Sequence, residues 1–395
     1  MTKVDIQVWT HLDAEEAFFF LITNVMIVGG LVAIDHAIAL VQLQIATSPG
    51  SMSNLTGFGK LLTTFTINND PKDSQFIQSL ANSVQTVASA SQSMYMGSSM
   101  FQGQLRVDLI FLYSFCRITD DLVDEAPDRT TARTLIDQSR QLLDFQFASS
   151  EPGLLNSAKA QNEKHTKNQY IPQSLISAVE RLPSTRLNSH HLHGLLQGFV
   201  TDLEFDAEKG SFPIKTEEHL ESYALHVAGT VAASVLELVF HHYPEHISAK
   251  DHSLRQRVVA AGEGMGQALQ YVNIARDIER DALIQRVYLP TTWLYKEGLT
   301  PADVIAEPCN PKILLPKQRM LDKADACARA AEGAIAYLPT GIQGPVRATV
   351  ESYMAIGTEL RNPGARCLRG GKIKLPLWRR LYVAYSAMAR SEVAA

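Results

Sequence analysis

Apolar residues recur at intervals of three and four along most of this chain, which limits the folds that are open to it. The spacing is clearest over residues 105–115, 219–240, 258–275 and 318–338. Such a period places apolar side chains on one face of an α-helix. No stretch has the sustained period-two alternation of a half-buried strand. The sequence therefore predicts an all-α body, with helix breaks where prolines and glycines interrupt the pattern.

The composition supports a folded core and excludes some classes of function. Hydrophobic residues make up 46% of the 395 residues and charged residues 19%, so intrinsic disorder of the whole chain is excluded. The net charge of −5 argues against a nucleic-acid partner. Cys116, Cys309, Cys327 and Cys367 are far apart and form no C-x-x-C pair. We therefore expect no disulfide framework, no cysteine-based zinc site and a reducing, intracellular location.

Charge is distributed unevenly along the sequence. From Arg361 to the C-terminus the chain has eight Lys or Arg residues and one acid, Glu392, which leaves a net charge of −12 on the other residues. A basic segment suits anionic phospholipid head groups, where each basic residue contributes about 1 kcal/mol. A solvated surface is the alternative interpretation.

Residues 17–34 form a membrane-like segment. They read AFFFLITNVMIVGGLVAI, in which only Thr23 and Asn24 are polar. As a helix the segment would be about 27 Å long, close to the hydrocarbon thickness of a thin bilayer. We predict one membrane-spanning helix here, with a buried core helix as the alternative. The stretch over 45–73 is rich in Ser, Thr, Asn and Gly and predicts a linker.

An acidic motif ends the apolar run over 105–115. It reads RITDDLVDE, from Arg117 to Glu125. On a helix, Asp120 and Asp124 are four residues apart, so their carboxylates lie on one face. Two like charges on an apolar helix are unfavourable without a partner. The motif therefore predicts a compensating cation.

A second acidic motif ends the apolar run over 258–275. Asn273, Asp277 and Asp281 are spaced by four residues and would form one stripe of oxygen ligands on a helix. Mg²⁺ prefers oxygen ligands, usually takes few carboxylates, and leaves its other positions to phosphates and water. Two such helices that face each other would hold Mg²⁺ ions and, through them, a diphosphate.

Three arginines lie beside these motifs. Arg117, Arg276 and Arg286 would bind phosphate oxygens in a bidentate manner. One acidic motif alone is better explained as a solvated surface. Two motifs on apolar helices, each with an arginine nearby, favour a site for metal and diphosphate.

Taken together, these segments resemble the head-to-head prenyl synthases of the squalene/phytoene synthase family. LYSFCRITDDLVDE is similar to the first aspartate-rich motif of that family, and QYVNIARDIERDALIQRVYLP to the second. SQSMYMGSSMF resembles the opening helix, GFVTDLEFD the central D-L-E element, and YALHVAGTVAASVLEL the helix that lines the prenyl channel. The R-V-Y-L-P run is close to that of phytoene synthases. The resemblance extends from about residue 91 to the C-terminus.

The resemblance implies an isoprenoid-synthase helical bundle with a central apolar cavity. It implies that two geranylgeranyl diphosphates condense through prephytoene diphosphate to phytoene, with Mg²⁺ or Mn²⁺ and without NADPH. The expected metal ligands are Asp120, Asp124, Asn273, Asp277 and Asp281. The expected catalytic residues are the four aspartates of that set and Tyr288. The expected substrate-binding residues are Ser93, Tyr113, Arg117, Val227, Gly229, Gln270, Arg276 and Arg286.

The N-terminal part has a resemblance of its own. HLDAEEAFFFLITNVMIVGGLVAID is similar to the last part of the small-membrane-protein type of lycopene cyclase, which fungi fuse ahead of a phytoene synthase. One span cannot enclose an acid-catalysed cyclisation, so we expect no cyclase activity, and expect a fragment or isoform of a longer protein. We predict a cyclase remnant over 1–45, a linker over 46–85 and a phytoene synthase domain over 86–395.

Two alternatives remain open. Squalene synthases share both acidic motifs but reduce their intermediate with NADPH, and a non-catalytic relative would serve as an assembly factor or scaffold. The intact motifs and the R-V-Y-L-P run favour phytoene formation. We expect the protein to associate with a membrane surface or bilayer and to pass its product to downstream carotenoid enzymes.

Overall fold

The computed structural model describes residues 7–9, 12–13, 71–90, 92–149, 171–247, 251–362 and 375–393. Contacts divide the chain into two compact units, residues 1–77 and 78–395. In the first unit, β1 (Gln7–Trp9) and β2 (Leu12–Asp13) pair as a short antiparallel hairpin, with Gln7 opposite Asp13. The membrane span predicted at 17–34 lies outside the described residues.

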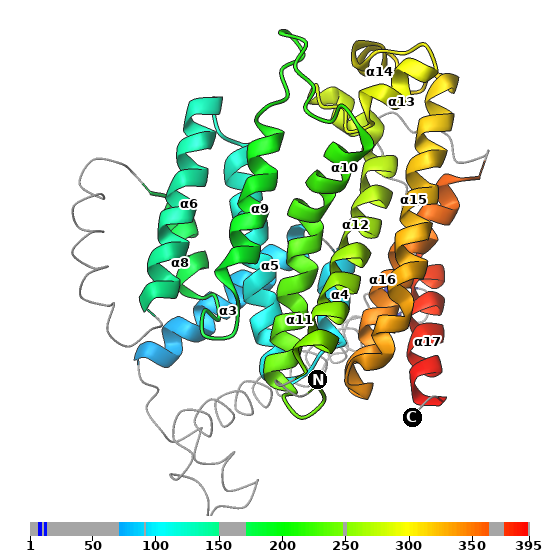
Figure 1. Cartoon of the computed structure of the whole chain (residues 1–395). Helices are drawn as coiled ribbons and strands as arrows, with labels where there is room; N and C mark the ends of the chain where they lie inside the picture. The colour runs from blue at the N-terminus through cyan, green and yellow to red at the C-terminus, as the bar shows by residue number, and fades with distance from the viewer. Residues whose placement is uncertain are drawn as a thin grey trace, which may run out of the picture. The chain divides into compact units, whose positions relative to one another are not determined.

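The second unit is built from helices (Figure 1). In sequence order they are α4 (Gln92–Ser99), α5 (Gly103–Asp124), α6 (Arg129–Ser149), α8 (Gln173–Glu180), α9 (Ser189–Asp202), α10 (Glu217–Ala224), the π-helical turn η2 (Leu225–Gly229), α11 (Thr230–His242), α12 (His252–Leu283), α13 (Thr291–Lys296), α14 (Pro301–Ala306), η3 (Pro311–Ile313), α15 (Leu314–Glu332), η4 (Gly333–Tyr337), α16 (Thr340–Leu360) and α17 (Leu377–Val393). The all-α prediction is confirmed, because the four periodic segments lie in α5, in α10–α11, in α12 and in α15–η4.

Helix α3 (Pro71–Ala90) overlaps the C-terminal part of the predicted linker. Residues 71–85, the last part of that linker, are helical rather than irregular. The domain boundary at residue 86 stays a prediction.

Apolar helix faces bury two large clusters of side chains. One lies among α5, α6, α8, α9 and α11 and includes the fully buried Phe115 and Leu196. The other involves α10 and α12–α15 and includes Tyr271 and Met320. Burial of one large apolar side chain contributes about 1.5–3 kcal/mol. Helix α12 packs against α11, α15 and α16 and is therefore central to the bundle (Figure 1).

A buried polar network ties α5 to its neighbours. The Asp108 carboxylate accepts hydrogen bonds from Arg186 at 2.6 Å, His242 at 2.7 Å and Gln104 at 3.0 Å. Asp108 is only 2% exposed, and a buried carboxylate is stable only with such partners. These bonds fix α5, which carries the first acidic motif, against α11.

One described helical run, Glu217–His242, is long and apolar enough to cross a membrane. Most of its apolar window is buried, and it packs against α9 and α12. These contacts make it a core segment of the helical unit.

The cysteines differ from expectation at one residue. Cys309 is disulfide-bonded, so the expectation of reduced thiols is wrong there. Cys116 and Cys327 are free. Burial raises the pKa of the Cys116 thiol to about 12, with Asp120 adding to the shift.

Helix α12 approaches the π-helical turn η2 at Gly266. A Cβ atom at Gly266 would lie 2.5 Å from the carbonyl oxygen of Ala228 and 2.9 Å from the Cα of Gly229. Backbone atoms cannot move aside as a flexible side chain can. Only glycine allows this close contact, which sets the distance between the second acidic motif and the η2 turn.

This contact predicts different outcomes for two glycines of the same helix. Gly266→Ala should lower the free energy of unfolding by about 1–3 kcal/mol, because the added methyl group overpacks the η2 contact. Gly264→Ala is the matched control, since nothing lies within 4 Å of its Cβ position, and it should leave stability unchanged or raise it by up to about 1 kcal/mol. Thermal denaturation of both variants checks the prediction, and equal melting temperatures would contradict it.

Candidate active site

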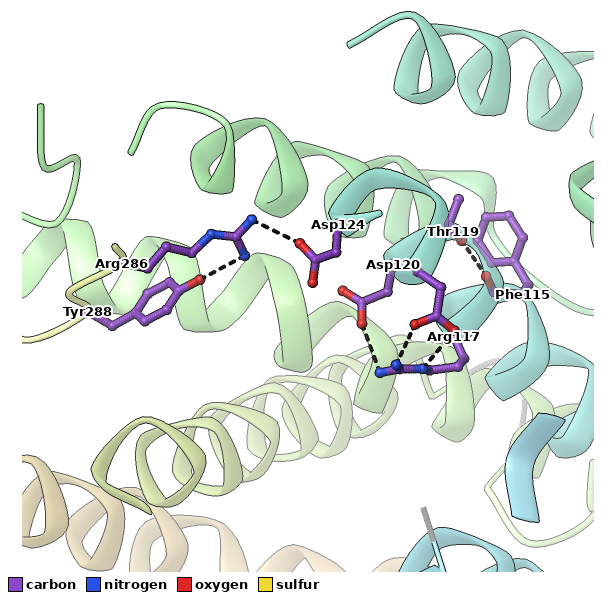
Figure 2. Close-up of polar contacts among 8 residues, drawn as sticks. Phe115, Arg117, Thr119, Asp120, Asp124, Arg286 and Tyr288 are labelled. Carbon is purple, nitrogen blue, oxygen red and sulfur yellow. Dashed lines mark hydrogen bonds and ion pairs between the residues drawn. The ribbon is translucent and has the colours of Figure 1, made fainter. Parts of the chain in front are cut away.

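The first acidic motif occupies the C-terminal end of α5. Arg117 holds it in place: its Nη1 donates to Asp120 at 3.1 Å and its Nε donates to Asp121 at 3.0 Å. Asp124, one turn further on, lies beside Asp120 and accepts a hydrogen bond from Arg286 instead (Figure 2). Asp121 therefore orients Arg117, and Asp120 and Asp124 are the carboxylates on the shared face.

The second acidic motif occupies the C-terminal end of α12. Arg276 makes a bidentate pair with Asp277, at 2.8 and 2.6 Å. Asn273 donates to Gln270 at 3.4 Å. The Asn273 Oδ1 atom is buried without a hydrogen-bond partner among the described residues. This oxygen is therefore available as a ligand.

Arg286 joins the two motifs. Gln285 adopts a left-handed backbone conformation with a φ of 62°, and the chain turns there at the end of α12. The Arg286 guanidinium then donates to Asp124 of α5 at 2.9 Å and to the Tyr288 hydroxyl at 3.5 Å (Figure 2). An arginine that follows the second motif in sequence thus binds the first motif in space.

The carboxylates of the two motifs lie in a common electrostatic field. Burial and the neighbouring Asp124 raise the pKa of Asp120 to about 7. Burial and the neighbouring Asp277 raise the pKa of Asp281 to about 8. Asp202 adds to the rise of both pKa values. Asp202 therefore lies close enough to both motifs to repel their charge.

Asp202 is a functional candidate that the two motifs leave without a role. It is the last residue of α9 and only 8% exposed. Its carboxylate accepts hydrogen bonds from Tyr288 at 2.7 Å and from Tyr223 at 3.0 Å. Burial raises its pKa to about 6, although Arg286 and the two tyrosines oppose the rise. A sequence signal existed, since α9, like α5 and α12, is an apolar helix with an acid at its C-terminal end.

The two tyrosines bound to Asp202 are packed as a unit. Their rings stack at 5.1 Å and 26°, and Phe205 contacts the Tyr288 ring edge-on at 5.0 Å. Tyr223 lines the cavity described next, whereas Tyr288 is not among the described residues that line it. Tyr288 therefore lies behind Tyr223, as part of its support.

A cavity of about 560 Å³ extends from the acidic motifs into the bundle. Its charged and amide lining consists of Arg117, Asp120, Asp202, Gln270 and Asn273, and hydroxyl groups come from Ser98, Thr349 and three tyrosines. Most of the other lining side chains are apolar and come from α5, η2, α11, α12 and α16, among them Leu112, Val227, Ala228, Val231, Met265, Leu269, Val346 and Val350. A charged end and a long apolar part suit an amphipathic ligand.

The other predicted site residues have the following positions. Tyr113 and Val227 line the cavity. Gly229 faces α12 instead, because a Cβ there would lie 3.2 Å from the Glu263 carbonyl oxygen. Ser93 belongs to α4, but its side chain lies outside the described residues. Asp124 ends α5, and Asp277 and Asp281 lie in the last two turns of α12. The described residues that line the cavity include none of these three, nor Arg276 or Arg286.

The donor set of the two acidic motifs suits a divalent cation. Among the described residues, no three His, Cys, Asp or Glu side chains form a ready-made metal cluster. The donors of the two motifs are all oxygens, however, and one of them, Asn273 Oδ1, has no partner. Mg²⁺ commonly binds through one or two carboxylates together with substrate phosphates and water. The residues therefore fit a metal ion that binds together with a diphosphate.

Protonation of the site generates a prediction on pH. Asp120 and Asp281 have folded-state pKa values of about 7 and about 8, above the ordinary 3.8. Between about pH 4 and pH 8 the metal-free folded protein binds more protons than the unfolded chain, so its stability falls as pH rises through this window. Mg²⁺ with diphosphate should raise the melting temperature more at about pH 8.5 than at about pH 6, because at the higher pH fewer protons compete with the metal for the carboxylates. Mg²⁺ alone and diphosphate alone are the controls, and a shift that does not vary with pH would contradict the prediction.

Asp202 generates a second prediction. Asp202→Asn keeps an oxygen acceptor but removes the charge that strengthens the hydrogen bonds from Tyr288 and Tyr223, so turnover should fall by roughly 10- to 100-fold, equivalent to about 1.4–2.7 kcal/mol. The melting temperature should hold or rise, because a buried charge is lost. Asp206→Asn is the control, since Asp206 pairs with Arg129 at 2.7 Å outside the cavity lining. A double-mutant cycle with Tyr288→Phe measures the coupling, and additive effects would show that Asp202 does not act through Tyr288.

A comparison of sequences agrees with this geometry. The sequence model described as squalene/phytoene synthase matches residues 87–379. The bifunctional lycopene cyclase/phytoene synthase of Aspergillus oryzae is 49% identical over 98% of this chain and 65% of its own length. The protein of the same name from Gibberella fujikuroi is 42% identical over 98% of this chain and 65% of its own. The chain thus spans just under two thirds of the length of these relatives.

Solved structures share the fold. A dehydrosqualene synthase in complex with a ligand has a TM-score of 0.59 at 17% identity, over 81% of this chain and 99% of its own. A squalene synthase from Alicyclobacillus acidocaldarius has a TM-score of 0.53 at 18% identity, over 75% of this chain and 97% of its own. The predicted isoprenoid-synthase bundle is therefore confirmed. With the family match over most of the described helices, the chain belongs to the squalene/phytoene synthase family.

Proposed function

We propose that this chain condenses two geranylgeranyl diphosphates head to head, through prephytoene diphosphate, to phytoene in carotenoid biosynthesis. The observation that carries the proposal is the meeting of two acidic helix ends, joined by Arg286 to Asp124, at one end of an apolar cavity. The names of the relatives from Aspergillus oryzae and Gibberella fujikuroi, which include phytoene synthase, support the same reaction.

The diphosphate end of the substrate requires positive charge before it can leave. Enzymes of this family that condense prenyl diphosphates generally use a divalent metal. We propose Mg²⁺, with Mn²⁺ as a substitute, held by the residues of the two acidic motifs. When bound, such an ion acts as a Lewis acid that neutralises the leaving diphosphate. The proposed ligands are Asp120, Asp124, Asn273, Asp277 and Asp281.

The arginines of the chain supply the rest of the positive charge. Arg117, Arg276 and Arg286 are each paired with an aspartate of the site. A diphosphate would offer the same guanidinium groups bidentate oxygen partners. Once a metal ion neutralises the aspartates, the arginines can form their ion pairs with the diphosphate instead. Ser93, Tyr113 and Gln270 are proposed as further diphosphate contacts.

The apolar cavity serves the hydrocarbon chains and the cationic steps. Ionisation of the first substrate leaves an allylic cation, which the double bond of the second attacks to form the cyclopropyl ring of prephytoene diphosphate. Val227, Ala228 and Val231 would hold prenyl chain and exclude water, since water would trap the cation as an alcohol. The rings of Tyr113 and Tyr223 line the same cavity and would stabilise positive charge.

We also propose that the protein works at a membrane on the intracellular side and passes phytoene to downstream carotenoid enzymes. The tails of the substrate and the whole product are hydrocarbon, so transfer through water would be unfavourable. Cyclase activity is not expected from this chain.

The product assay tests the proposal directly. The protein incubated with geranylgeranyl diphosphate and Mg²⁺ should form phytoene, identified by chromatography and mass spectrometry, at the same rate with or without NADPH. A reduced product that requires NADPH would instead identify a squalene-type condensation. No product in either reaction would favour a non-catalytic family member.

Substitutions test the two acidic motifs. Asp120→Asn and Asp277→Asn should each lower turnover by at least about 100-fold, because each removes a carboxylate proposed to hold the metal that neutralises the leaving diphosphate. Glu279→Gln is the matched control. Glu279 lies on α12 between Asp277 and Asp281 and interacts electrostatically with Lys317, so this variant should keep near-normal turnover. Circular dichroism establishes that the variants fold. Full activity in Asp120→Asn or Asp277→Asn would remove the metal-site proposal.

A further inference from the structure

Helix α17 (Leu377–Val393) presents an aromatic stripe to the outside of the molecule. Trp378 is 69% exposed, Leu381 50%, Tyr382 67% and Tyr385 73%. Their spacing of three and four residues places all four within an arc of about 100° on one side of the helix. We call these four residues the α17 stripe.

The stripe belongs to a helix that is docked on its other side. Helix α17 packs along α16, as Figure 1 shows at the red end of the chain. Ala387 is fully buried, and Arg379 forms an ion pair with Glu359 of α16. The exposure of the stripe therefore follows from how the helix is oriented, and not from a lack of tertiary contacts.

Other exposed apolar side chains in the described residues are arranged differently. In sequence they occur singly or as adjacent pairs, at Tyr95, Leu283, Ile284, Tyr295, Leu314, Leu315 and Tyr337. Four on one face of one helix form a contiguous patch, which indicates an interaction surface.

The chemistry of the stripe and its surroundings suits a lipid surface. Trp and Tyr are favoured at the level of phospholipid head groups because each has an apolar body and a polar atom. The sequence around the stripe is basic and includes Lys372, Lys374 and Arg380, in addition to Arg379, which is paired with Glu359. Basic residues beside exposed aromatic ones are the composition of helices that lie in the interface of anionic membranes.

The position of α17 also relates to the cavity. Helix α16, on which α17 packs, contributes Val346, Val350 and Tyr353 to the cavity lining. One helix therefore separates the stripe from the space proposed for prenyl chains. A membrane bound at the stripe would lie beside the apolar part of the site.

We propose that the α17 stripe binds in the head-group region of an anionic phospholipid membrane. The inference rests on the membrane association proposed above and gives it a defined surface. It does not depend on which condensation the site performs.

Quenching of Trp378 fluorescence by brominated lipid tests the proposal. The full chain has three tryptophans, and subtracting the signal of Trp378→Phe isolates Trp378. Vesicles of phosphatidylcholine and phosphatidylserine with brominated acyl chains should quench Trp378 by at least about twofold. This reporter senses α17 itself, even if another segment anchors the chain. An unquenched Trp378 on vesicle-bound protein would overturn the proposal.

A variant of the stripe with a matched control isolates the surface. Leu381→Ser/Tyr382→Ser/Tyr385→Ser keeps Trp378 as the reporter and should raise the lipid concentration for half-maximal quenching by about tenfold. Leu315→Ser/Tyr295→Ser/Tyr337→Ser changes the same residue types at similar exposure elsewhere, and should leave that concentration unchanged. Equal effects of the two variants would overturn the proposal, as would equal quenching by vesicles that lack phosphatidylserine.

Two further measurements separate competing explanations. Sedimentation in detergent-free buffer reports self-association. A stripe variant that dissociates a dimer without changing quenching would assign the stripe to a second copy and overturn the proposal.

Phytoene formation in detergent micelles should be unchanged in the stripe variant. If the parent protein forms no phytoene while Trp378 is quenched, the proposed function fails and the α17 inference stands.

Discussion

Negative charge gathered at three helix ends is the constraint on which the site depends. Helices α5 and α9 end at Asp124 and Asp202, α12 has Asp281 in its last turn, and each helix C-terminus adds about half a negative charge of its own. Burial, and then repulsion among these carboxylates, raises the pKa values of Asp120, Asp202 and Asp281. This negative charge must be offset by protons or by positive charge from other groups. The arginines supply part of that charge, and a metal ion would supply the rest.

The bundle holds these helix ends together with contacts beyond the acidic motifs. Gly266 lets α12 touch the η2 backbone, and the Asp108 network ties α5 to α11. The Asp108 network lies outside the cavity lining, whereas Gly266 and Ala228, which meet at the other contact, also line the cavity. The repulsion among the carboxylates is therefore opposed by packing as well as by arginine.

The sequence predicted the parts of the site that are local and missed those that depend on the fold. Periodicity located the helices, and the i, i+4 spacing of Asp120 and Asp124 placed both on one helix. It could not show that Arg286 reaches Asp124, since the two residues are 162 positions apart. Nor could it show Asp202 beneath Tyr288, because that contact requires α9 to end beside the turn after α12. The helical start of α3 was missed for a different reason: a polar composition was read as a linker, although a helix can begin in polar residues.

The arginines give the site a way to link metal binding to substrate binding. Arg117, Arg276 and Arg286 hold aspartates that are also the proposed metal ligands. A metal ion alone would compete with these arginines for the carboxylates, and a diphosphate alone would compete with the carboxylates for the arginines. The two together exchange both sets of partners at once, so every charge keeps an opposite charge beside it. The ion-pair pattern thus favours joint binding of metal and diphosphate over either one alone.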